Sequence, residues 1–96
     1  MEIFVFARLH ARPGKRREVH QAIFDVQAPT RAEPGCRSYG AFQSVRDADE
    51  FYIHSCWQDM AAFDRHAELA HTKRFVETVE PLLDDPLKVT LAERLW

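Results

Sequence analysis

The sequence predicts one α+β domain over residues 1–96, in which a four-stranded antiparallel sheet carries helices on one face. Three observations lead to this fold class. A length of 96 residues leaves room for a single hydrophobic core. A hydrophobic share of 46% with only three glycines gives enough apolar surface to close that core, and it excludes disordered and collagen-like chains. Apolar residues alternate with a period of two in the expected strands and recur at helical spacing between them.

The first strand is expected over residues 3–12, where β-forming residues alternate between two apolar faces. One face carries Ile3, Val5, Ala7 and Leu9, and the other carries Phe4, Phe6, Arg8 and His10. A Pro-Gly pair then breaks the strand. A helix is expected over about 15–32 because apolar residues recur there on one helical face, with Pro29 kinking the last turn before a Glu-Pro-Gly turn ends it.

The second half of the chain adds a β-hairpin, two helical segments and a last strand. Residues 36–45 and 50–57 are expected to form the hairpin around a polar turn. Asp59 is a suitable N-cap for a short helix that runs to about residue 67. A second helical segment follows, with an apolar stripe of Phe75, Val79, Leu82 and Leu83. Residues 87–96 are expected to close the chain as the fourth strand.

This order of elements is that of a ferredoxin-like βαββαβ fold, in which the helices cover only one face of the sheet. The opposite face would carry an uncovered apolar patch of Phe4, Phe6, Tyr52, His54 and Trp96. A patch of this kind marks an interface in a protein this small. We therefore expect a homodimer joined through this sheet face, a dimeric α+β barrel with two-fold symmetry.

Charge and cysteine content exclude several classes of partner. Thirteen Lys and Arg against fifteen Asp and Glu leave a formal charge of -2, so no nucleic acid or anionic membrane is expected as a partner. The sequence has neither a leader pattern nor a run of about 18 apolar residues, which favours a soluble, cytoplasmic protein. Cys36 and Cys56 lack metal or redox spacing and are expected to be buried thiols in a reducing compartment.

Five histidines raise the question of a metal site, but their spacing fits no common ligand motif, so neither a metal nor another cofactor is expected. His66 and His71 are five residues apart, which would separate them by about 140° on a continuous helix. They flank the break between the two helical segments and are the best candidates for moving a proton at neutral pH. Alternatively, His66 only orders that break. His20 is expected at the surface, and His10 and His54 on the dimer face.

Several segments together indicate a family. They are residues 12–15 (Arg-Pro-Gly-Lys), the turn and strand at 30–39, the strand at 51–57, and the side chains of Phe63, His66, His71 and Phe75. In these the chain resembles the antibiotic biosynthesis monooxygenase (ABM) domain family, which includes quinol monooxygenases and cofactor-free anthrone oxygenases. The resemblance runs nearly end to end, and it implies a dimeric α+β barrel with a mostly apolar pocket between the sheet and the helices of each subunit.

The resemblance also implies roles for individual residues. The pocket would bind a small aromatic substrate through Val5, Ala7, Leu9, Ser55 and Phe75. Trp57 would orient the substrate ring, or would serve only as a core aromatic, and His66 or His71 would handle the proton. Relatives commonly have a glutamate at the position of Ser55, so a carboxylate partner for the histidine is expected to be missing. Haem-degrading relatives have asparagine and histidine where this chain has Ala7 and Val76, which disfavours haem degradation.

The resemblance therefore implies a cofactor-independent monooxygenase that oxidises a quinol, phenol or anthrone-type substrate with O₂, using neither metal nor flavin. Two other classes stay open. One is a non-catalytic module that binds a small hydrophobic metabolite, and the other is a cofactor-free isomerase or dehydratase that uses the same histidine. Hydrolase, kinase and nucleotide-dependent activities gain no support, because the chain lacks their motifs.

Overall fold

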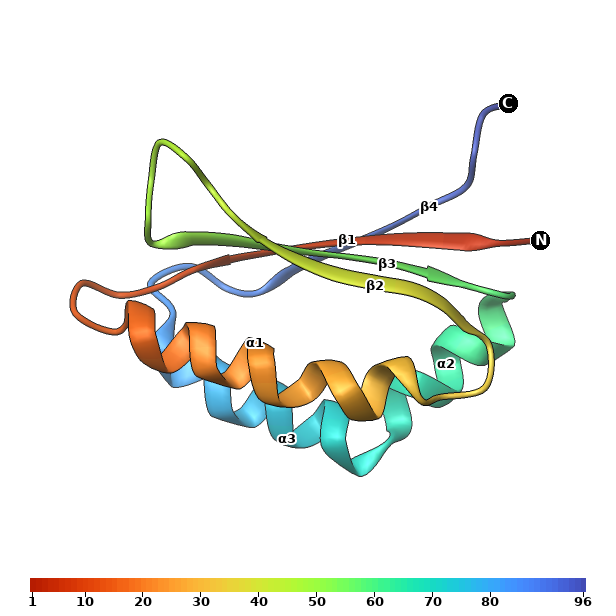
Figure 1. Ribbon diagram of the computed structural model, residues 1–96, viewed down its shortest axis with the longest axis horizontal. Helices are drawn as coiled ribbons and strands as arrows, with labels where there is room; N and C mark the ends of the chain where they lie inside the picture. Colours follow the sequence, from red (N-terminus) through yellow and green to blue (C-terminus); the bar gives the residue numbers. More distant parts are fainter.

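Strands and helices follow one another in the expected order in the computed structural model, which describes residues 1–96 (Figure 1). The elements are β1 (Ile3–His10), α1 (Arg16–Arg31), β2 (Cys36–Gln43), β3 (Glu50–Trp57), α2 (Met60–Glu68), α3 (Ala70–Val79), a 3₁₀ turn (Glu80–Leu82) and β4 (Lys88–Ala92). The strands form one antiparallel sheet in the order β2-β3-β1-β4. The ferredoxin-like α+β fold is thereby confirmed.

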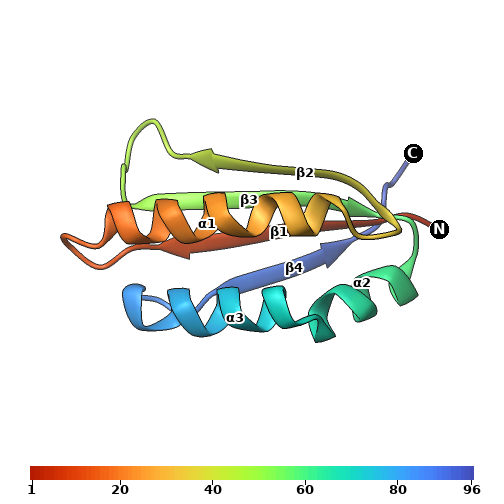
Figure 2. The ribbon, with the colours of Figure 1, turned by 60° about the horizontal axis from the view of Figure 1, so that its bottom comes forward.

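All three α-helices lie on the same side of the sheet, with α1 beside α3 and α2 at one end (Figures 1 and 2). The predicted inward faces of the central strands are the ones that meet this helical layer. In β1 the buried side chains are Ile3, Val5 and Leu9, and in β3 they include Phe51, Ile53 and Trp57. Each of the larger apolar side chains contributes about 1.5 to 3 kcal/mol to folding by leaving water.

The buried apolar side chains form two clusters at opposite ends of the central strands. The larger cluster consists of Leu9, Ala11, Val19, Ile23, Phe51, Ile53, Val79 and Leu83, and the smaller one of Ile3, Val5, Trp57 and Ala62. The register explains their separation, since Leu9 pairs with Phe51 at one end and Ile3 with Trp57 at the other. The middle of this face carries the small side chains of Ala7 and Ser55. Space is therefore left between the two clusters.

The outer strands are shorter than expected because their partners end. Phe4, near the start of β1, pairs with Ala92, so the residues after Ala92 have almost no strand left to bond. β4 ends there rather than at residue 96, and Trp96 is 94% exposed outside the sheet. β2 similarly ends at Gln43 instead of residue 45. The first helix, in contrast, continues through Pro29 to Arg31.

The face of the sheet away from the helices carries exposed aromatic rings. Phe6 is 50% and Tyr52 is 40% exposed, and the His54 ring lies between Phe4 and Phe6 with centroid distances of 6.3 and 4.9 Å. The guanidinium carbon of Arg94 lies 4.9 Å from the Phe4 ring centroid. The chain's own helices leave this aromatic face uncovered (Figure 1). None of those helices has the length and apolar character needed to cross a membrane.

Candidate functional site

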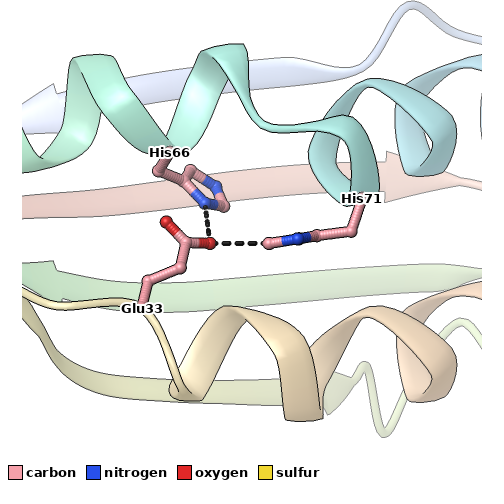
Figure 3. A group of neighbouring side chains, drawn as sticks. All are labelled: Glu33, His66 and His71. Carbon is pink, nitrogen blue, oxygen red and sulfur yellow. Dashed lines mark hydrogen bonds and ion pairs between the residues drawn. The ribbon is translucent and has the colours of Figure 1, made fainter.

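One buried carboxylate joins two histidines on the helical side of the sheet (Figure 3). Glu33 lies in the turn after α1, His66 in the last turn of α2, and His71 in the first turn of α3. A single oxygen of Glu33, Oε2, lies 2.8 Å from Nδ1 of His66 and 2.7 Å from Nε2 of His71. Because the Glu33 side chain is only 6% exposed, its charge depends on these two partners more than on water.

The break between α2 and α3 makes this arrangement possible. Leu69 is extended, with φ -72° and ψ 148°, and its N–H donates to the His66 carbonyl at 3.2 Å. A new helix then begins at Ala70, so His71 does not keep the angular position that a continuous helix would give it. The expected divergence of His66 and His71 is therefore wrong, and both side chains meet the same carboxylate oxygen.

Gly35 fixes the turn that carries Glu33 against α2. Its φ is +90°, a region that other residues rarely adopt, and a Cβ at this position would lie 2.7 Å from the Cβ of Ala62. The Gly35 carbonyl accepts a hydrogen bond from the Gln58 N–H at 2.8 Å, just before α2 begins. The backbone around Glu33 can approach the helix of His66 this closely because position 35 has no side chain.

The hydrogen bonds to Glu33 assign the histidine protons. An ionised carboxylate only accepts, so His66 donates through Nδ1–H and His71 through Nε2–H. In the neutral form of His66, Nε2 then holds the free lone pair. The Thr72 hydroxyl lies 3.3 Å from the same Nδ1 and adds a weaker contact. A carboxylate that holds one ring nitrogen in this way leaves the other nitrogen available as a base.

Trp57 holds His66 from the side of the sheet. The two ring centroids are 4.5 Å apart, with planes inclined by 33°. The indole is fully buried, and its Nε1–H donates to the Ser55 hydroxyl at 3.0 Å. Phe63 contributes a further contact, with its ring centroid 5.9 Å from that of His66. The position of the His66 ring is therefore fixed by packing as well as by the carboxylate.

A cavity of about 220 Å³ lies between the sheet and the helices, in the space between the two core clusters. Its wall is mostly apolar and includes Val5, Ala7, Ile53, Ser55, Phe63, His66, Phe75 and Val89. Four of the five residues expected to bind substrate thus lie in the wall. The fifth, Leu9, lies outside the cavity wall: its side chain is fully buried in the larger core cluster, where its strand partner is Phe51.

The three residues proposed for catalysis differ in their access to this cavity. His66 lies in the cavity wall. Trp57 has no exposed surface and stands behind His66, so it supports that ring instead of lining the cavity. His71 lies on a separate surface hollow beside Asp25 and Arg74. Of the three, His66 is the side chain placed to meet a bound molecule.

Besides Thr72, which contacts His66, three hydroxyl groups give the apolar cavity a polar character at defined points. The Thr30 Oγ1 is buried in the wall and has no hydrogen-bond partner, which is costly unless a ligand satisfies it. Burial raises the pKa of Tyr39 to about 12, so its phenol stays neutral. Ser55 accepts from the Trp57 indole, and its own hydroxyl hydrogen remains available to a bound molecule. The cavity therefore offers hydrogen bonds without offering a formal charge from these three groups.

Glu33 is the site residue that the sequence interpretation missed. The expectation that no carboxylate would pair with the candidate histidines is wrong, because Glu33 takes the role despite Ser55 on β3. A signal was available in the predicted hairpin: because β2 and β3 pair antiparallel, the turn that contains Glu33 lies beside the end of β3, just before α2 begins. The other histidines lie elsewhere: His10 pairs with Asp47 and Asp84, His54 packs on the open face, and His20 is exposed.

Comparison with known proteins yields a consistent group of relatives. The sequence model of the family described as "Antibiotic biosynthesis monooxygenase" matches residues 2–78. The chain is 33% identical to a Mycobacterium tuberculosis protein, "Putative monooxygenase Rv0793", over 93% of this chain and 87% of that protein. It is also 33% identical to "Putative monooxygenase YcnE" of Bacillus subtilis, over 95% of this chain and 96% of that protein.

Two further relationships concern structure and length. The solved structure of Rv0793 superimposes with a TM-score of 0.94 at 30% sequence identity, covering 99% of this chain and 96% of that chain. An uncharacterised Synechocystis protein, sll1783, is 28% identical over 93% of this chain, but the match spans only 60% of that longer protein. The family-model match over residues 2–78 includes the first three strands, α1, α2 and the turn of Glu33, whereas β4 lies beyond it.

Proposed function

Because the chain belongs to the antibiotic biosynthesis monooxygenase family, we propose that it oxidises a small hydroxylated aromatic molecule with O₂ in the cavity beside His66. The observation that carries this proposal is the pairing of His66 with a buried carboxylate at the wall of an apolar cavity. An apolar space with a few convergent polar groups is the usual form of a small-molecule site. Its volume suits a compact ring system.

His66 is the proposed catalytic base. Its Nδ1–H is held by Glu33, and Nε2 is then the nitrogen able to take a phenolic or enolic proton. Glu33 and Trp57 are positioning residues in this proposal, because each acts on His66 and not on the substrate. His71 is a positioning residue too, since it binds the same Oε2 and keeps the carboxylate in place.

The proposed reaction draws its electrons from the substrate. For a phenol, loss of the proton to His66 gives a phenolate, which passes one electron to O₂, and the two radicals combine at a ring carbon that carries hydrogen. The proton held by His66 returns to this peroxide, and loss of water then leaves a carbonyl on that carbon. The sum is phenol plus O₂ giving quinone plus water, so one oxygen atom enters the product and the other leaves as water. The apolar wall favours this chemistry by keeping bulk water from the intermediates.

The hydroxyl groups of the wall support a neutral, oxygen-bearing substrate. Thr30 lacks any partner within the protein, and a hydroxyl or carbonyl of the ligand would supply one. Tyr39 stays a neutral phenol that is able to donate to such a group. A charged ligand would gain little here, because the cavity wall carries no cationic or anionic side chain apart from a protonated His66. We therefore favour phenols and anthrones over carboxylated rings.

The proposal includes a homodimer through the open face of the sheet. Phe6 and Tyr52 are half-exposed there around His54, and the family to which the chain belongs is commonly dimeric. Burial of these rings in a second copy would remove apolar surface from water at about 25 cal/mol per Å². The cavity lies on the other side of the sheet, so each subunit would keep its own site.

The test follows oxygen consumption and quinone formation when 1-naphthol or anthrone is added to the purified protein. We expect turnover in the unaltered protein, a loss on the order of a hundredfold or more in His66→Ala, and unchanged turnover in His20→Ala, which removes an exposed histidine of α1. Equal rates in His66→Ala and the unaltered protein would contradict the role of His66 as the catalytic base. Thermal stabilisation by these ligands without oxygen uptake would instead favour the non-catalytic binding module.

A further inference from the structure

We propose that Glu33, His66 and His71 form a binding site for one divalent first-row transition metal ion such as Zn²⁺. The three candidate ligand atoms are Oε2 of Glu33, Nδ1 of His66 and Nε2 of His71 (Figure 3). No two of them are more than 4.8 Å apart. Two imidazoles and one carboxylate are a ligand set that Zn²⁺ and Fe²⁺ both accept.

An ion at this point would replace the two hydrogen bonds, with a small shift of the carboxylate and a closer approach of the two imidazole rings. Metal bonds of about 2.0 to 2.2 Å place neighbouring ligand atoms about 2.8 to 3.1 Å apart in octahedral geometry and about 3.3 to 3.6 Å apart in tetrahedral geometry. The two carboxylate-to-imidazole distances are now 2.8 and 2.7 Å. The carboxylate oxygen therefore needs to move by only a few tenths of an ångström, whereas the two imidazole nitrogens, which lie within 4.8 Å of each other, would have to close to about 3.6 Å or less to share the ion. Each ligand comes from a different element, so these shifts need no change within a helix.

Charge and access also favour a cation at this point. The Glu33 carboxylate is nearly excluded from water and has only two neutral donors to compensate it when both histidines are uncharged. The side chains of His66 and His71 keep 15% and 21% exposure, which leaves a path from solvent. Three protein ligands leave a fourth position for water or a small ligand, which is the arrangement found in catalytic zinc sites.

His10, which pairs with Asp47 and Asp84, does not form a cluster of this kind. His10 binds Asp84 through Nδ1 and Asp47 through Nε2, at 2.8 and 2.7 Å. Its two carboxylates therefore lie on opposite edges of one ring, and they cannot share an ion with that ring. Both clusters contain histidine and carboxylate at similar distances, but only the Glu33 cluster brings three ligand atoms together.

Binding of the ion would change the tautomer of His66. Coordination through Nδ1 requires that nitrogen to lose its hydrogen, and in a neutral ring the proton then resides on Nε2. The nitrogen assigned above as the base would become a donor. This consequence rests on the proposed function, and it predicts that the metal inhibits oxygenation at the concentration at which it binds. The binding itself does not depend on any reaction.

The test is a calorimetric titration of untagged, chelator-treated protein with Zn²⁺, without substrate. We expect one ion per chain, with affinity at least about tenfold weaker in His71→Ala and unchanged in His10→Ala. Addition of Co²⁺ to the unaltered protein should give visible absorption bands that report nitrogen and oxygen ligands. This second measurement needs no variant, and it serves if His71→Ala fails to fold.

Either of two results would overturn the metal site. One is Zn²⁺ affinity in His71→Ala, shown to be folded by circular dichroism, equal to that of the unaltered protein. The other is an absence of Co²⁺ bands together with Zn²⁺ binding no tighter than in the His66→Ala, His71→Ala double variant. Absence of oxygenase activity with intact Zn²⁺ binding would contradict the proposed reaction and leave the metal site standing.

Discussion

The buried indole of Trp57 packs on the ring of His66, with centroids 4.5 Å apart. This contact crosses from β3 to α2, so a strand residue with no surface of its own sets the position of a side chain in the cavity wall. Trp57 also closes the smaller core cluster, where it packs with Ile3, Val5 and Ala62. Its contribution to stability and its contribution to the site are therefore linked.

Substitution Trp57→Phe should lower both stability and turnover. The smaller ring leaves a void beside His66 and removes the hydrogen bond to Ser55, which together cost about 1 to 3 kcal/mol in the free energy of unfolding. Urea denaturation measures that loss, and kcat with 1-naphthol measures the effect on His66. Unchanged kcat in a destabilised Trp57→Phe protein would leave Trp57 as a core residue only.

Substitution Glu33→Gln should reduce kcat with little effect on KM. Glutamine keeps the size of the side chain but removes the charge, and a hydrogen bond to a neutral acceptor is weaker than one to a carboxylate by about 1 kcal/mol. The substrate would still bind, since Glu33 is not in the cavity wall, but His66 would be oriented less firmly. We expect kcat to fall by on the order of tenfold to a hundredfold.

Glu18→Gln is the matched control for this variant, because Glu18 is an exposed side chain of α1 paired only with Lys15. Steady-state kinetics on both variants separates the two parameters. A rise in KM alone in Glu33→Gln would show that Glu33 contributes to substrate binding instead of orienting His66.

The phenol of Tyr39 should ionise at a higher pH than an ordinary tyrosine. Burial raises its pKa to about 12, from an ordinary value of 10.0. Absorbance at the phenolate wavelength should therefore show a late step in the native protein that is absent in Tyr39→Phe. Hydrogen bonding to Glu50 also raises the pKa of Tyr52, so the Tyr39→Phe variant is needed to assign the step to Tyr39.

The same shift fixes the direction of a stability change at high pH. Between pH 10 and about 12 the unfolded chain has released the Tyr39 proton while the native protein retains it. Native Tyr39 therefore contributes stability that is complete below pH 10 and is lost as the pH rises toward 12. The free energy of unfolding, measured by urea denaturation, should fall more steeply over this range in the unaltered protein than in Tyr39→Phe. Parallel curves for the two proteins would contradict the buried state of the ring.

Substitution Phe6→Lys should dissociate the proposed dimer. The charge would be placed at the centre of the open sheet face, beside His54, where a second copy would have to bury it. Sedimentation at micromolar concentration should show a dimer for the unaltered protein and a monomer for the variant. Phe24→Lys is the control, because Phe24 is 59% exposed on the helical side of the molecule. If the unaltered protein sediments as a monomer, the proposed interface is contradicted.

Strand and helix order could be predicted from the sequence because each element satisfies a local rule. Alternation in β1 identified its buried face, and Asp59 indeed accepts the Ala62 N–H at the start of α2. Strand ends could not be predicted in the same way. β4 ends at Ala92 because β1 has almost no further residues to pair with it, and that limit depends on register rather than on the residues of β4.

The candidate site was predicted only in part, for a related reason. His66 and the cavity-facing positions of β1 and β3 follow from periodicity and family resemblance. The pairing with Glu33 depends on three backbone events far apart in sequence: the turn at Gly35, the break at Leu69 and the restart of α3. Each is ordinary by itself, and only their relative placement in the folded chain brings the two histidines to one oxygen.

The geometry of the site depends on the glycine at position 35, although this residue does not line the cavity. Any side chain there would collide with Ala62 and would also have to adopt an unfavourable backbone angle. The collision would push the turn and α2 apart, lengthening the contact between Glu33 and His66 without altering either residue. A random mutagenesis screen for lost activity should therefore recover substitutions at this glycine as readily as substitutions of the histidine itself, and a survey of natural variation should find the position intolerant of change.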